Sequence, residues 1–109
     1  MSDDYKVYLS DILRSIDKVE RYTKGLTYKE FIKNDLIVDG VVRNLEIIGE
    51  AVKHIRLSMR KEYPLIEWKK IAGLRDILIH LYSGVNLQII WDIVVNKVPE
   101  LKEALKQIK

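Results

Sequence analysis

The chain has 109 residues, the length of one domain, so residues 1–109 are expected to form a single globular unit. Charged residues make up 32% of the chain, and no long apolar run suggests a membrane span or a signal peptide. The absence of cysteine excludes disulfides and thiolate metal sites, and a cytoplasmic protein is expected. The net charge of +3 permits nucleic-acid binding but does not by itself indicate it.

Apolar residues recur every three or four positions along most of the chain, which predicts amphipathic helices packed side by side. The first helix is expected over 3–24 and ends at Gly25, a residue suited to a left-handed C-terminal cap. Thr27 and Glu30 have the spacing of a capping box, so a short second helix is expected through Lys33. Period-two alternation flanked by turn residues is not found, so strands are not expected.

The later helices are predicted from caps and breaks. Asn34 can cap a long third helix over 35–61. A fourth helix is expected over 67–83, ended by the glycine that follows, and Asn86 can cap a fifth helix over 87–96. Pro99 suits the first turn of a last helix. Long helices joined by short loops predict an all-α antiparallel bundle of four to six helices.

The fourth predicted helix carries, among its leucines, four side chains that can bind phosphate, transfer protons or carry a covalent group. At about 100° per residue, Asp76 and His80 lie opposite the buried face and one turn apart, so they can touch. Arg75 and Tyr82 share one flank, and Ile79 lies between that flank and the Asp76–His80 side. This polar face can be a solvent-exposed ion pair at the edge of the core, or it can be a site or a subunit interface.

The third predicted helix has a similar second stripe. Arg43, Glu46, Glu50 and His54 fall on one side, and Glu50 and His54 are again four residues apart. Surface ion pairs explain such a stripe as well as a site does. Gly49 falls near the core edge, where a missing side chain lets another helix approach closely. With two histidines and no cysteine, no metal site and no cofactor are expected.

Two segments, VVRNLEIIGEAVKHI (41–55) and WKKIAGLRDILIHLYSGVN (68–86), resemble the HepT-like branch of the HEPN-domain proteins. The resemblance extends over nearly the whole chain. The family motif is an arginine, a polar residue, a histidine five positions after the arginine and a tyrosine two positions further. The matching residues are Arg75, Asp76, His80 and Tyr82. The chain departs from close relatives at Asp76, where asparagine is frequent, and before Trp68, where proline is common.

The resemblance implies a helical homodimer whose two motifs meet across a cleft, and a metal-independent endoribonuclease that acts as the toxin of a toxin–antitoxin pair. His80 would transfer protons, Arg75 would bind phosphate and Asp76 would orient the imidazole. Because RNA carries its own 2′-OH nucleophile, a 2′,3′-cyclic phosphate product is expected. Tyr82 is implied to accept AMP from a minimal nucleotidyltransferase, the antitoxin.

Arg43 and Glu50 are expected to line the same cleft. The expected partners are RNA, the nucleotidyltransferase and a second copy of the chain, whereas neither DNA nor a membrane is expected. A second hypothesis is a HEPN-like dimer without cleavage activity, which binds a nucleotidyltransferase partner or a nucleotide. A third is a purely structural helical dimer.

Overall fold

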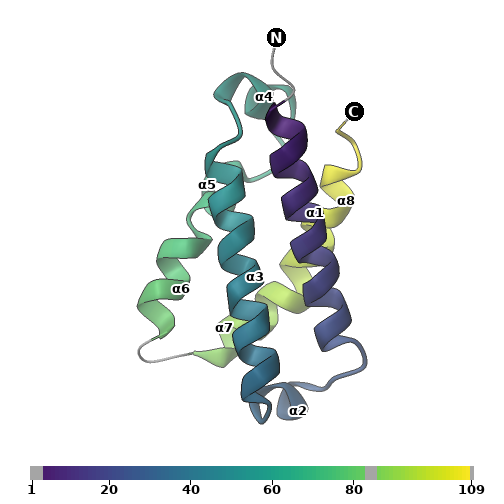
Figure 1. The fold of residues 1–109 in the computed structure, drawn as a ribbon, viewed down its shortest axis with the longest axis vertical. Helices are drawn as coiled ribbons and strands as arrows, with labels where there is room; N and C mark the ends of the chain where they lie inside the picture. Colours follow the sequence, from purple (N-terminus) through teal and green to yellow (C-terminus); the bar gives the residue numbers. More distant parts are fainter. Residues whose placement is uncertain (1–3, 83–85, 109) are drawn as a thin grey trace.

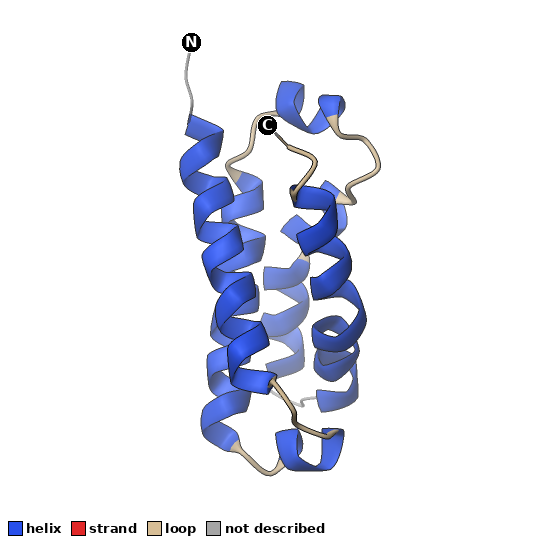
Figure 2. Cartoon of the chain, turned by 90° about the vertical axis from the view of Figure 1, so that its right-hand side faces the viewer, coloured by secondary structure: helices blue, strands red, loops and turns tan. Residues whose placement is uncertain are grey.

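The structure is a computed structural model that describes residues 4–82 and 86–108, without the side chains of Asp4 and of residues 79–82. Every regular element in these ranges is helical, which confirms the predicted all-α class (Figures 1 and 2). None of the helices in the described ranges has the length and apolar character needed to span a membrane.

Two long antiparallel helices, α1 (Asp4–Thr23) and α3 (Asp35–Lys53), form the centre of the fold. In Figure 1, α3 lies between α1 on one side and α5 and α6 on the other. Both helices bury the apolar stripe that their spacing predicts, because each stripe faces the neighbouring helices. The most deeply buried of these side chains are Ile12, Ile16, Val19, Val41, Leu45, Ile48 and Val52.

The connection between these helices follows its local sequence signals. Gly25 has a φ of +77°, the left-handed conformation predicted for the end of α1. The predicted capping box opens α2 (Tyr28–Ile32): the Glu30 N–H donates to Thr27 Oγ1 at 3.2 Å, and the Thr27 N–H donates to Glu30 Oε1 at 2.9 Å. The second of these bonds holds the pKa of the Glu30 carboxyl below its ordinary value. Asn34 caps α3, as predicted.

The third helix is shorter than predicted, because α3 ends at Lys53 instead of continuing to position 61, and α4 (Leu57–Glu62) follows after a turn. The side chain of Arg60 stabilises this break. Its Nη2 donates to the Val52 carbonyl at 2.7 Å, and its Nε donates to the Ile55 carbonyl at 3.0 Å. The guanidinium therefore bonds carbonyls at the end of the helix that a continuing helix would pair with its own N–H groups.

The predicted fourth helix is also divided in two, into α5 (Trp68–Ala72) and α6 (Leu74–Tyr82). The break lies at Gly73, whose ψ of −8° departs from the helical value. Glycine is a weak helix former, so the change of direction is tolerated there. The expected end of this helix at 83–84 lies outside the described residues.

The C-terminal helices form one continuous run, although two separate helices were predicted over 87–96 and from Pro99. Asn86 caps α7 (Leu87–Asp92), as predicted, and a π-helical turn over Ile93–Lys97 leads directly into α8 (Val98–Leu105). Pro99 stands in the first turn of α8, as expected. Because proline has no N–H to donate, the wider turn before it absorbs the interrupted hydrogen-bond pattern without ending the helix.

Candidate functional site

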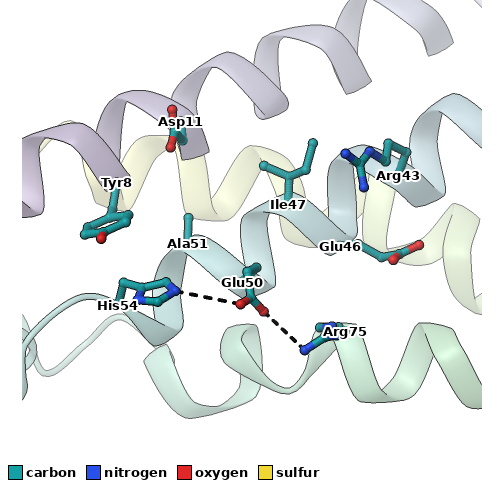
Figure 3. Close-up of a pocket in the computed structure, with 9 residues that line it drawn as sticks. All are labelled: Tyr8, Asp11, Arg43, Glu46, Ile47, Glu50, Ala51, His54 and Arg75. Atoms are coloured by element: carbon teal, nitrogen blue, oxygen red, sulfur yellow. Dashed lines mark hydrogen bonds and ion pairs between the residues drawn. The ribbon is translucent and has the colours of Figure 1, made fainter.

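A hollow of about 470 Å³ opens on the side of the bundle where α1, α3 and α6 meet. Its floor is formed by successive turns of α3 and one wall by the first part of α1, and Arg75 reaches it from the described side chains of α6 (Figure 3). Both cationic and acidic groups face it. The lining residues are Tyr8, Asp11, Arg43, Glu46, Ile47, Glu50, Ala51, His54 and Arg75.

The motif arginine reaches the hollow from α6 and is paired there with α3. Arg75 Nη1 donates to Glu50 Oε2 at 3.4 Å, although the two residues are 25 positions apart in the chain. Both side chains are about half exposed, at 46% and 49%. Solvent screens the pair at this exposure, so the contact contributes little to folding stability.

The other oxygen of the same carboxylate faces His54, the histidine outside the motif. His54 Nε2 lies 3.7 Å from Glu50 Oε1, which confirms that the predicted one-turn neighbours meet. The His54 ring stacks on Tyr8 of α1, with centroids 5.0 Å apart and an interplanar angle of 14°. Figure 3 shows Glu50 between His54 and Arg75, with one oxygen directed to each. The carboxylate therefore links α3 and α6.

Gly49 permits the close approach of the chain that carries Arg75. A Cβ atom at this position would lie 3.1 Å from the Ile71 carbonyl oxygen and 3.2 Å from the Arg75 backbone nitrogen. Any side chain would therefore press on the backbone at the end of α5 and the start of α6. The predicted close helix approach at Gly49 is confirmed, and it sets the distance between Glu50 and Arg75.

Some of the predicted site residues line the hollow, and others do not or lie outside the described side chains. Arg43, Glu50 and Arg75 line the same hollow. Asp76 is exposed on α6 and does not belong to the lining. The backbones of His80 and Tyr82 belong to the last turns of α6, but their side chains lie outside the described part of the structure. Within that part, no three His, Asp or Glu side chains gather as metal ligands would.

Two lining residues from α1, Tyr8 and Asp11, did not stand out in the sequence. They are three residues apart and therefore share a helix face beside the buried stripe, which was the available signal. The sequence does not show that this face meets the polar stripe of α3.

The all-helical fold, with an Arg-x4-His-x-Tyr helix packed against a polar stripe of α3, defines a HEPN-type domain. Comparison with known protein families identifies one of them. The family described as Ribonuclease HepT-like matches residues 12–108, and the chain belongs to this family.

Several known proteins are similar to this chain over most of its length. The chain is 45% identical over 105 residues to "Putative RNase MJ1216" of Methanocaldococcus jannaschii, covering 96% of this chain and 87% of that one. It is 35% identical over 109 residues to "Probable ribonuclease HepT" of Thermococcus cleftensis, covering 100% and 99%. Another M. jannaschii relative, "Gamma-glutamylcyclotransferase and putative RNase MJ0434", is 44% identical over 108 residues, but this chain spans only 49% of its length. No solved structure matches the chain.

Proposed function

We propose that this protein is a metal-independent endoribonuclease, the toxin of a toxin–antitoxin pair. The observation that carries the proposal is the position of Arg75: the motif arginine of a HepT-like chain lines an open hollow together with Arg43. Two guanidinium groups at one surface hollow suit a phosphodiester backbone, because each offers several N–H donors in a plane. The names of similar proteins support a ribonuclease.

The proposed reaction needs no atom beyond the RNA and the protein. A base removes the proton of the 2′-OH, the 2′ oxygen bonds to phosphorus, and the bond from phosphorus to the 5′ oxygen breaks. An acid protonates the leaving 5′ oxygen, and the products are a 2′,3′-cyclic phosphate and a 5′-OH. His80 is assigned to proton transfer, Arg75 to the charge that develops at phosphorus, and Asp76 to orienting His80 from one turn away. DNA has no 2′-OH and would not be cleaved.

The proposal includes a homodimer. Each chain has one motif histidine, whereas the reaction has a base step and an acid step, so two copies facing each other would supply one histidine for each. The exposed Ile77 of α6, 46% accessible, lies on the motif helix and would be covered in such a dimer. In the proposed dimer, the motif face of one copy contacts the motif face of the other.

Neutralisation by a minimal nucleotidyltransferase completes the proposed system. The Tyr82 hydroxyl would attack the α-phosphorus of ATP, forming Tyr82–AMP and releasing pyrophosphate. The tyrosine follows Arg75 by two helical turns on α6, so the added phosphate would carry negative charge toward the phosphate-binding arginine. Substrate RNA would then be repelled and sterically blocked.

The main alternative is a HEPN domain without cleavage activity that binds a nucleotidyltransferase or a nucleotide. The mild net charge of +3 favours this alternative, because strong RNA binders usually carry a pronounced basic surface. The two functions differ in what the motif histidine does.

His80→Ala separates them. In the ribonuclease, the substitution should lower the rate of RNA cleavage by about 10²- to 10⁴-fold, the usual contribution of a proton-transfer group. His54→Ala removes the only other histidine and should leave cleavage readily detectable. In the binding module, wild type and His80→Ala would both fail to cleave RNA and would bind the nucleotidyltransferase equally well. That outcome would overturn the proposal.

A further inference from the structure

Two glutamates of α3 line the hollow, one helical turn apart, but they differ in their contacts. Glu50 contacts Arg75 through one carboxylate oxygen and approaches His54 with the other. Glu46 lines the same hollow, but within the described part of the chain it forms no ion pair with Arg75. The pair therefore contrasts two equal charges, of which only one is directed at the motif arginine.

The Glu50–Arg75 contact does not have the properties of a stabilising ion pair. Both side chains are about half exposed, and the N–O distance of 3.4 Å is long for a charge-assisted hydrogen bond. A small net stability is compatible with ordering of the side chains, because the electrostatic gain of an exposed pair is offset by the rotamer freedom that the two residues lose. Arginine has many rotamers, and a free guanidinium at a surface hollow would sample a wide range of positions. The contact at Nη1 restricts these positions, and within the described part of the chain the other N–H groups of the guanidinium are left to bind phosphate.

Glu50 has neighbours on both sides. Gly49 brings the backbone at Arg75 against α3, so the two side chains start from a fixed separation. On the far side, His54 is stacked on Tyr8 and stands 3.7 Å from the second carboxylate oxygen. An acceptor with neighbours on both sides favours one orientation of the guanidinium.

We propose that Glu50 is a positioning residue for Arg75, which it holds in the orientation that meets the substrate phosphate. The inference rests on the proposed ribonuclease function. This role has opposite effects on the affinity for RNA and on the rate of the cleavage step. The Glu50 carboxylate competes with phosphate for the guanidinium and so weakens ground-state RNA binding. In return, it pre-orients the donor that stabilises charge at phosphorus in the transition state.

Three variants separate charge from positioning in single-turnover cleavage of unfractionated tRNA. Glu50→Gln and Glu46→Gln remove the same charge from the same hollow, so both should lower the half-saturating enzyme concentration. Only Glu50→Gln should also lower the maximal rate, by about tenfold, because only this change frees Arg75. Glu50→Asp keeps the charge but shortens the reach, so it should lower the maximal rate without tightening binding. Equal maximal rates for Glu50→Gln and Glu46→Gln, or a full wild-type rate for Glu50→Asp, would overturn the inference.

A second readout does not depend on cleavage. The ¹⁵N relaxation of the Arg75 Nε–H group reports how strongly this side chain is restricted. The order parameter should fall in Glu50→Gln and stay at the wild-type value in Glu46→Gln. An unchanged order parameter in Glu50→Gln would overturn the positioning role. If wild type and His80→Ala both leave tRNA intact, the ribonuclease function fails, while this measurement still decides whether Glu50 holds Arg75.

Discussion

Two glycines of α3 allow a direct test of how the motif helix is positioned. Gly40 and Gly49 both lie inside the helix, and a Cβ added at either would meet its nearest neighbour at 3.1 Å. The neighbours differ. At Gly40 they are ring carbons of Tyr22, a side chain that is 37% exposed and can rotate away. At Gly49 they are backbone atoms of Ile71 and Arg75, which can move only if a helix moves.

The same substitution should therefore have opposite effects. Alanine gains about 1 kcal/mol over glycine in a helix interior, so Gly40→Ala should raise the free energy of unfolding by roughly 0.5–1 kcal/mol. At Gly49 the same gain is opposed by overpacking, which costs about 1–3 kcal/mol. Gly49→Ala should therefore lower the free energy of unfolding by about 1 kcal/mol. It should also reduce RNA cleavage, because the added methyl group pushes Arg75 away from Glu50.

Urea unfolding followed by circular dichroism, at one fixed protein concentration, measures both free energies of unfolding. Gly40→Ala is the matched control for helix propensity. If Gly49→Ala stabilises the protein as much as Gly40→Ala does, the backbone contact at Gly49 does not set the packing of α3 against α6, and the reasoning is refuted.

Three further substitutions test the helix ends. Thr27→Ala removes the side-chain cap of α2 and should cost about 1 kcal/mol in the free energy of unfolding, measured by urea titration. Because the pKa of Glu30 is lowered in the folded state, its contribution is present above the unfolded pKa and is lost as pH falls through the folded pKa. Glu30→Gln should therefore flatten the acid side of the stability–pH curve, and an unchanged curve would contradict this. Arg60→Met leaves the Val52 and Ile55 carbonyls without its guanidinium and should speed amide hydrogen exchange in the last turn of α3; unchanged exchange would argue against the cap.

The elements that could be predicted from the sequence are those set by neighbouring residues. The Thr27–Glu30 capping box and the turn at Gly25 depend on contacts within three or four positions, and both are present. The apolar stripes of α1 and α3 depend on helical period alone and are buried as expected. Short-range rules are sufficient here because the interacting groups are fixed by the helix geometry itself.

The helix breaks could not be predicted because they depend on contacts that helical periodicity does not contain. Positions up to 61 continue an apolar pattern, yet α3 ends at Lys53, where the Arg60 side chain reaches back eight residues to the Val52 carbonyl. In the same way, a single glycine at position 73 does not reveal that α5 and α6 change direction there.

In the candidate site, too, contacts within one helix could be predicted from the sequence, whereas contacts between helices could not. Helical geometry predicts that Glu50 and His54 are neighbours and that another helix can approach closely at Gly49, and both are found. It places Arg75 and Glu50 on the polar faces of two helices, but it does not show that these faces meet, because the contact spans 25 positions. The contribution of Tyr8 depends in the same way on how α1 packs against α3.

The most direct test of the ribonuclease proposal is to identify the RNA ends that the purified protein produces in EDTA. Wild type is predicted to yield 2′,3′-cyclic phosphate and 5′-OH ends, and His80→Ala is predicted to yield neither. Cleavage that stops in EDTA and returns with a divalent ion, or products that end in a 3′-OH, would contradict the proposed metal-independent mechanism.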